Sequence, residues 1–456
     1  MPDDRAPVLY SRRSFLAGSA LLAGGAAAAP LLSACDASSG GSGTSGGKTT
    51  LSVMYASNEL TKEHIADFEG RNPDIKIQLI EPGNDDAKLN AMLAAGNPPD
   101  LVRGAAVGSA NNNARGLATS LDPYLDKSTV LKKEDLLAVN DNWRWDGHQV
   151  GAGPYYGITK DWSQDATLWY NVALFEQAKV APLSTTEPVT YDKLLEIARK
   201  LTVKKDGKTV VYGVGIEWQW GLYGPLCSMI LSQGGSLYSA DLTRTDLTTP
   251  EALRALRWLV DLAQSGAAPS SLNPLPDQAD LSTFMAKRMA ITQDGYWYGG
   301  NFFEAAEDMK ASIRMAPAPM MGDKRVSPCY AGIGAWIPAK AKNKDAAWKL
   351  MEYFMAGPPA EERAKSGWGL PALKSLLPQM PQELPYQQEA YKTAQAELDY
   401  NVPLPVSPYV TVGNWISALN TYVDQAARKK ITVEVAGQKI TEDINKLLKQ
   451  GKDRIG

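Results

Sequence analysis

Hydrophobic and polar positions follow two periodicities along the chain, about two residues in some segments and about 3.6 residues in others. Together they predict short strands separated by amphipathic helices. Residues 50–55 and the strictly alternating residues 75–79 are typical of strands, and a helix between them begins near Thr61. A further helix leads to Leu101, where a third strand opens. Strands that alternate with helices of about 10–15 residues predict βαβ units and a mainly parallel sheet.

Four later helices have clear starting signals. Thr190 is predicted to cap a helix over residues 191–202, whose apolar side chains form one stripe. Thr249 precedes a proline and a glutamate, which is a favoured order at a helix N-terminus. A third helix is expected over residues 343–356, and Thr441 is predicted to cap the final helix of the chain.

The N-terminal segment has the layout of an export signal. Paired arginines at 12–13 precede an alanine-rich apolar run, 16–32, which is short for a bilayer span and leads into Leu-Ser-Ala-Cys. The arginines resemble a twin-arginine signal, and the last four residues resemble a bacterial lipobox. This resemblance implies removal of residues 1–34 and lipidation of Cys35, followed by a Gly/Ser tether to residue 47. The alternative is a plain signal peptide with an incidental cysteine.

Composition excludes several classes of protein. The 456 residues are 44% hydrophobic and 21% charged, with a net charge of −3, so no basic field for nucleic acid is present. Only two histidines occur, which disfavours triad hydrolases and histidine-rich metal sites, and we expect neither cofactor nor metal. Cys227 and Cys329 remain after lipidation, and they form either a disulfide or two buried free thiols.

Short motifs recur through the body of the chain in a defined order. They are Phe68 with Pro73, Ile75 and Ile77; Gly96–Val102; Tyr170-Asn171 with Leu174-Phe175; Pro188 with Thr190-Tyr191; Phe284–Ile291 with Gly295 and Trp297; Pro317–Pro319; Ala346–Trp348; and Gly369–Pro371. In this order they resemble family 1 of the bacterial extracellular solute-binding proteins, the capture components of carbohydrate ABC importers. The sequence departs from the family pattern at Lys287 and Ile291, where the family has glycine and methionine.

The resemblance implies an α/β fold of the type II periplasmic-binding-protein class. Each of two lobes would hold a mostly parallel sheet flanked by helices, with a hinge between the lobes and ligand gripped in the cleft. Chain crossings are expected near 159–166, 330–336 and 367–373. The N-terminal lobe would then comprise 48–165 plus 334–372, and the C-terminal lobe 166–333 plus 373–456.

The aromatic composition favours a polyol ligand. Twelve Trp and nineteen Tyr accompany only seven Phe, and sugar C–H faces pack on aromatic rings that also carry a polar group. Trp258 and Trp348 lie inside amphipathic helices and are expected in the core. Any single other tryptophan could also be a packing residue. The tryptophans expected at the ligand are Trp162, Trp218, Trp220, Trp297, Trp336 and Trp368.

Carbohydrate hydroxyls also need oxygen and amide partners, and several polar side chains near strand ends are candidates. Glu59, Asp161 and Asp294 are the leading ones. For any single polar residue the competing interpretation is a solvated loop position or a helix cap. The remaining candidates are Tyr55, Asn58 and Asn111, the last of which opens a run of three asparagines.

The function implied by the resemblance is capture of an extracellular carbohydrate and its delivery to ABC importer permease subunits. We expect a monomer without catalytic activity, attached by its lipid to the extracytoplasmic face of the cell membrane. One alternative is the same role for a polyamine or a glycerophospho compound, and the charge of the cleft would distinguish them. A more remote alternative is a secreted glycoside hydrolase, because paired carboxylates with aromatics also make that site.

Overall fold

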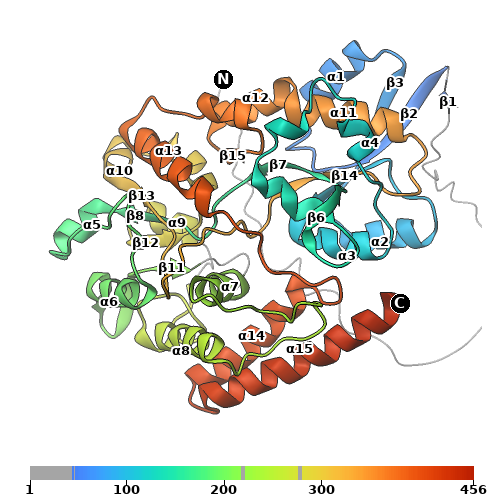
Figure 1. The fold of residues 1–456 in the computed structure, drawn as a ribbon. Coiled ribbons are helices and arrows are strands. Elements are labelled where there is room, and N and C mark those ends of the chain that lie inside the picture. The colour runs from blue at the N-terminus through green and yellow to red at the C-terminus, as the bar shows by residue number, and fades with distance from the viewer. Residues whose placement is uncertain (1–43, 46, 217–220, 276–279, 456) are drawn as a thin grey trace, which may run out of the picture. The chain divides into compact units, whose positions relative to one another are not determined.

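Strands from distant parts of the chain meet in one seven-stranded sheet, here called the large sheet (Figure 1). Its strands are β1 (Thr44–Ser45), β2 (Lys48–Met54), β3 (Ile75–Ile80), β4 (Leu101–Ala105), β7 (Ile158–Trp162), β14 (Ile333–Trp336) and β15 (Leu370–Pro371). The order is β2-β4-β14-β7-β15, and β2 also pairs with β1 and β3. The computed structural model describes residues 44–45, 47–216, 221–275 and 280–455, so the predictions for Cys35, Trp218 and Trp220 lie outside the described residues.

A second, four-stranded sheet, here called the small sheet, has the order β11-β12-β8-β13. Its strands are β8 (Leu168–Asn171), β11 (Gly215–Ile216), β12 (Ile291–Gln293) and β13 (Ile313–Ala316). Two antiparallel ribbons lie outside both sheets. They are β5 (Arg144–Trp145) with β6 (Val150–Tyr155), and β9 (Val203–Lys205) with β10 (Lys208–Val211).

The α/β class is confirmed, but the prediction of mostly parallel sheets is wrong. In the large sheet β2 pairs in parallel with β3 and β4, as the intervening helices predict. In contrast, β14 pairs in antiparallel orientation with both β4 and β7. In the small sheet β8 is antiparallel to both its neighbours, β12 and β13. The reason is that β14 and β8 enter directly from the other sheet, so no crossover helix sets their direction.

The chain passes between the two sheets at three places. Residues 163–167 connect β7 to β8, residues 317–332 connect β13 to β14, and the chain beyond β15 leads to helices that pack on the small-sheet side. These connections fall close to the three crossings expected from the sequence. The division into two lobes at these points stays a prediction and is taken up below.

Helices lie between and after the strands, and those expected near Thr61, after Thr190 and after Thr249 begin where predicted. They are α1 (Lys62–Arg71), α2 (Asp86–Ala94), α3 (Ser109–Ala114), α4 (Asp122–Leu125), α5 (Val172–Gln177), α6 (Tyr191–Leu201), α7 (Tyr223–Ser232), α8 (Pro250–Ser265), α9 (Asp280–Met285), α10 (Glu307–Ser312), α11 (Lys344–Ala356), α12 (Pro358–Ser366), α13 (Pro385–Glu397), α14 (Val412–Ala427) and α15 (Val433–Ile455). The side chains of Thr61, Thr190 and Thr249 each accept a bond from the first turn of their helix.

The predicted cap at Thr441 is wrong. This residue lies inside α15, and its hydroxyl donates to the carbonyl of Gly437 and accepts from the backbone of Leu247 at 2.8 Å each. Apolar residues continue at helical spacing on both sides of Thr441, with Ile440 and Ile444 fully buried, and this packing overrides the weak helix preference of threonine.

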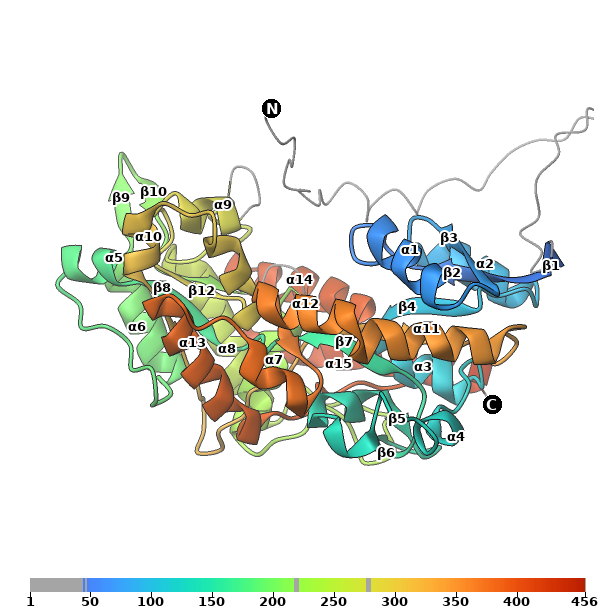
Figure 2. The ribbon, with the colours of Figure 1, turned by 90° about the horizontal axis from the view of Figure 1, so that it is seen from above.

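One hydrophobic cluster covers the large sheet and another the small sheet, and a third contains residues of both, among them Trp162 of β7 and Trp169 of β8. Strand β2 packs through Leu51 and Val53 against α11, which lies beside β7 with α12 following it (Figure 2). Helix α8 packs with α14 and α15, and its Trp258 contacts Tyr191 of α6. Trp258 and Trp348 are both buried, as predicted. None of the helices in the described part of the chain has the length and hydropathy of a membrane span.

Both internal cysteines are free. Cys227 on α7 and Cys329 on the connection to β14 are fully buried, and burial raises the pKa of each thiol. Of the two alternatives left open by the sequence, the structure therefore has the pair of buried thiols.

Candidate functional site

One lysine joins two of the predicted carboxylates. The Nζ atom of Lys160 lies 3.1 Å from Oε2 of Glu59 and 2.6 Å from Oδ2 of Asp161, and its side chain is only 5% exposed. Glu59 follows the carboxyl end of β2, whereas Lys160 and Asp161 are neighbours on β7. The structure thus brings Glu59 and Asp161 together through a residue that the sequence analysis did not select.

A β-bulge explains how consecutive residues of one strand can form this pair. Thr159 pairs with Gly334 and Asp161 with Ile333, so Lys160 is an extra residue on β7. Side chains of a regular strand alternate between faces, and a bulge interrupts that alternation and redirects a side chain. The bulge therefore lets Lys160 reach the carboxylate of its own neighbour.

Arg103 completes the environment of Glu59. From β4, its guanidinium makes two-pronged bonds to that carboxylate, with Nη2 to Oε1 at 2.6 Å and Nε at 3.0 and 3.2 Å. Burial works against ionisation of Glu59, but Lys160 and Arg103 outweigh it and hold its pKa below the ordinary value. Glu59 is therefore a fixed, ionised acceptor.

A third cation, Arg363 on α12, lies near the same carboxylates. Its Nη2 donates to the carbonyl of Phe354 at 2.6 Å, and its guanidinium lies 4.5 Å from the centroid of the Phe354 ring. Burial lowers the pKa of Arg363, and the charges of Asp161 and Glu59 oppose that effect. The cluster therefore combines three cations with two carboxylates.

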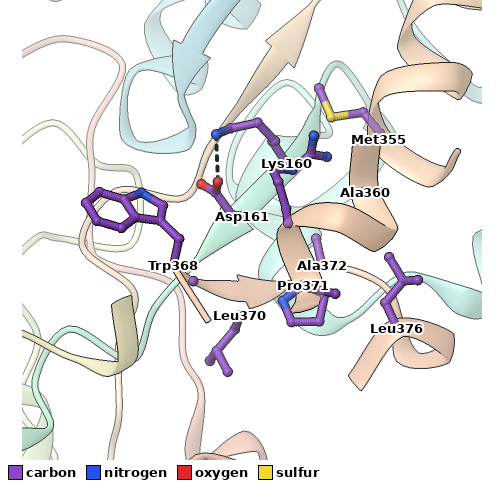
Figure 3. A pocket seen from close by; sticks show the side chains of 12 residues that line it. Lys160, Asp161, Met355, Ala360, Trp368, Leu370, Pro371, Ala372 and Leu376 are labelled. Atoms are coloured by element: carbon purple, nitrogen blue, oxygen red, sulfur yellow. Dashed lines mark ion pairs between the residues drawn. The ribbon is translucent and has the colours of Figure 1, made fainter. Parts of the chain in front are cut away.

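A small cavity that opens to solvent lies beside this cluster and is lined by Lys160, Asp161, Arg363 and Trp368 among others. Figure 3 shows the Lys160–Asp161 ion pair with the indole of Trp368 on the other side of Asp161. Trp368 is 50% exposed and stands between two glycines. Gly367 ends α12 at φ 68°, and a Cβ at Gly369 would lie 3.2 Å from the Cβ of Asp161.

Trp297 meets Trp368 from the small-sheet side of the chain. Their ring centroids are 6.0 Å apart in an edge-to-face arrangement. Trp297 is part-buried in the 3₁₀ helix Tyr296–Phe302, and its backbone N–H donates to Oγ of Ser163 at 3.2 Å. Two tryptophans and two carboxylates predicted at the ligand therefore come together: Trp297, Trp368, Glu59 and Asp161.

Three aromatic candidates serve the core instead. Trp162 is 4% exposed and donates from Nε1 to the carbonyl of Pro371 at 3.0 Å. Trp336 packs in a buried cluster with Trp143. Tyr55 is fully buried with its hydroxyl 3.4 Å from the carbonyl of Gly334. Their predicted contact with a ligand stays a prediction, and in this structure the three rings are buried among protein atoms.

The remaining polar candidates lie apart from the cavity lining. Asp294 is fully buried and accepts a bond from the hydroxyl of Thr292. Asn111 donates from Nδ2 to the carbonyl of Pro408 at 2.7 Å, which fixes a loop. Asn58 is exposed on the turn after β2. The predicted ligand contacts of these three residues stay untested predictions, and the first two already have protein partners.

Comparison with known proteins settles the family. The family model described as "bacterial extracellular solute-binding protein" matches residues 52–360. The chain belongs to this family. A curated relative, a maltotriose-binding protein from Pyrococcus abyssi, is 23% identical over 339 residues, which are 73% of this chain and 68% of the relative. The resemblance drawn from the motifs is confirmed.

Solved structures agree with this solute-binding fold. A substrate-binding protein, Lmo0181 from Listeria monocytogenes in complex with cycloalternan, superposes with a TM-score of 0.72 at 23% identity, covering 87% of this chain and 97% of the other. The sugar-binding protein MalE from Xanthomonas citri gives 0.70 at 20% identity, covering 89% and 98%. At such identities the likeness shows the fold.

Sequence reasoning missed the three cations of this solute-binding protein's cluster. Arg103 and Arg363 carry no motif, and their position depends on strand pairing and helix docking. Lys160 has a signal that could have been used: in Ile158-Thr159-Lys160-Asp161-Trp162, two consecutive charged residues stand inside a segment of strand-forming residues. Within the described ranges no group of three or more His, Cys, Asp and Glu side chains could hold a metal.

Proposed function

We propose that this solute-binding protein captures a carbohydrate outside the cytoplasm and delivers it, chemically unchanged, to an ABC-type membrane importer. The observation that carries the proposal is the half-exposed indole of Trp368, which lines a cavity with the ion-paired carboxylate of Asp161. A ring that offers its face to solvent beside a fixed acceptor suits a sugar, because one side of a sugar is C–H and its edge is hydroxyl. The sugars in the names of the relatives support the same class.

The proposed binding mode uses both parts of the chain. Glu59 and Asp161 would accept hydrogen bonds from hydroxyls, and Trp368 and Trp297 would pack on the ring. In this proposal the lobes are 48–165 plus 334–372 and 166–333 plus 373–456, and they close on the ligand at the three connections. Ligand that contacts both lobes binds the closed form better than the open one, which is the condition for closure.

Anchoring and partners are part of the same proposal. Lipidation at Cys35 would hold the protein at the extracytoplasmic face of the membrane, where a monomer would meet the importer permease subunits. Replacement of Cys35 by alanine should release a soluble and ligand-competent protein from the membrane fraction. A variant that stays with the membrane would contradict the lipid anchor.

Charge and pKa argue against the glycosidase and polyamine alternatives. A glycosidase needs a carboxyl group whose raised pKa keeps its proton for the leaving group, whereas the pKa of Glu59 is lowered and one lysine is shared by both carboxylates. A polyamine site needs an excess of carboxylates, whereas the cluster around Lys160 has an excess of cations. We therefore propose binding without turnover.

Isothermal titration calorimetry with a panel of mono- and oligosaccharides, polyamines and phosphodiesters tests this function. The expected result is saturable binding of a saccharide and recovery of that saccharide unchanged after prolonged incubation. Binding of a polyamine in place of any sugar, or release of shortened sugars, would contradict the proposal.

A further inference from the structure

The cavity beside Trp368 carries an imbalance of charge that neutral sugar binding does not use. Glu59 already has two cation partners, Arg103 and Lys160, and Asp161 shares Lys160. The third cation, Arg363, has no carboxylate within ion-pair distance among the described residues. Counted over these five side chains, the cluster has one more cation than carboxylates, next to a cavity that Lys160 and Arg363 both line. The charge of the exposed Glu362, the neighbour of Arg363 in sequence, also acts on that guanidinium.

Arg363 is also short of hydrogen-bond acceptors. Its Nη2 donates to the carbonyl of Phe354, but Nε and Nη1 are buried from solvent and have no hydrogen-bond partner in the described part of the chain. Guanidinium nitrogens can only donate, so these N–H groups need an oxygen atom. Buried donors without acceptors are rare in proteins and costly, and such a group points to a partner.

The chemistry of that partner follows from the two observations. A neutral hydroxyl could accept a hydrogen bond, but it would leave the excess charge uncompensated. An anionic oxygen group meets both needs of the site, the N–H groups without acceptors and the excess positive charge. A carboxylate or a phosphate accepts several N–H bonds and carries the opposite charge. The stacking surface of Trp368 lies on the same cavity, so the polyol part and the acidic part of one ligand have adjacent places.

We propose that the cavity lined by Lys160, Arg363 and Trp368 binds the acidic group of a negatively charged saccharide, a sugar carboxylate or a sugar phosphate. This inference rests on the proposed carbohydrate function and narrows its ligand class. Asp161 then has a second role. Its carboxylate holds Lys160 in place, and its negative charge repels any anion that does not also bind Arg363.

The test is calorimetry with sets of sugars that differ in one group: glucose, glucuronate and glucose 6-phosphate, together with the corresponding di- and trisaccharides. The expected result is that at least one acidic sugar binds about tenfold or more tightly than its neutral counterpart. The preference should shrink as salt is raised, because ions screen the attraction. Comparison of glucuronate with glucose 6-phosphate, and of their longer forms, tells carboxylate from phosphate.

Arg363→Gln separates a ligand contact from a purely structural role. The variant should lose the preference for the acidic sugar, so that its affinities for the acidic and the neutral sugar become similar. Arg428→Gln is the matched control, because Arg428 pairs with Asp424 on the surface of α14 and should leave the preference unchanged. If Arg363→Gln does not fold, the acid-to-neutral ratio and its salt dependence in the unaltered protein still decide the matter.

The outcomes also separate the two proposals. Tight binding of neutral sugars without any preference for acidic ones overturns this inference and leaves the carbohydrate function standing. Equal weakening of both ligand types by Arg363→Gln likewise overturns it. Absence of binding by every saccharide in the sets overturns both.

Discussion

Glu59, which follows β2, and Asp165, which follows β7, are two carboxylates with opposite electrostatic states. Glu59 faces Lys160 and Arg103, and its pKa is lowered in spite of its burial. Asp165, on the connection from β7 to β8, has no cation among its partners, and burial raises its pKa to about 7. The difference is the cations, since both side chains are largely removed from water.

The two environments suit two tasks. A carboxylate that stays ionised and fixed can accept hydrogen bonds from a ligand at any ordinary pH. Asp165 instead ties two connections between the sheets, because its Oδ2 accepts from the backbone N–H of Tyr330 at 2.6 Å. The thiol of Cys329 and the N–H of Ala331 also face it. In the proposed binding mode Glu59 belongs to the binding surface, whereas Asp165 belongs to the junction between the sheets.

Removal of the shared cation should have the largest effect. Lys160→Met leaves two mostly buried carboxylates with one cation fewer, and unfolding free energy should fall by about 3–5 kcal/mol. Urea unfolding monitored by tryptophan fluorescence measures this. The control is Lys193→Met, whose pair with Glu196 is about half exposed and should cost less than about 1 kcal/mol. Equal effects in the two variants would refute the description of Lys160 as a buried link.

The pH dependence of stability should show the state of Asp165. Its folded pKa of about 7 lies above the ordinary value of 3.8, so in this interval the folded state binds more protons than the unfolded state. Its stabilising contribution is complete at low pH and is lost as the pH rises through 7. Between pH 5 and pH 7 the loss is about 2–3 kcal/mol.

Asp165→Asn removes this titration while keeping an oxygen that can accept from Tyr330. Chemical unfolding at a series of pH values should therefore give a free energy of unfolding that depends less on pH in the variant. As the pH rises, the stability of the variant should increase relative to that of the natural protein. Parallel profiles for the two proteins would show that Asp165 keeps an ordinary pKa, and the contrast with Glu59 would then fail.

A smaller effect is expected at Trp297. Trp297→Ala should weaken sugar binding about tenfold, which corresponds to about 1.4 kcal/mol, because a packed ring face is lost. The melting temperature without ligand should change little if the ring belongs to the binding surface. A melting temperature that collapses in the absence of ligand would make Trp297 a core residue, in keeping with its contact to Tyr298.

Local signals were enough to predict most of the fold. The helix start near Thr61, the helix start after Thr249 and the alternating pattern of residues 75–79 depend on neighbours in sequence, and they are confirmed. The antiparallel entry of β14 could not be predicted, because strand direction there depends on a connection between sheets. The predicted cap at Thr441 is wrong because tertiary packing overrides the local signal. The helix continues through a residue type that favours helix caps.

The site was harder to predict because exposure is a tertiary property. Trp336 and Trp368 have similar local signals, yet the first is 3% exposed and the second 50%. The bulge that presents Lys160 depends on the register between β7 and β14 and has no sequence mark of its own. Carboxylates near strand ends were recognisable, whereas the cations that fix their charge state were not.

The most direct test of the central claim is sugar affinity after removal of the exposed indole. Trp368→Ala should weaken binding of the tightest saccharide about tenfold or more, as measured by calorimetry, with the melting temperature of the free protein unchanged. Val130→Ala, at an equally exposed apolar position, is the control and should leave affinity unchanged. Unaltered sugar affinity in Trp368→Ala would contradict the account, because the cavity beside Asp161 would then not be where the carbohydrate binds.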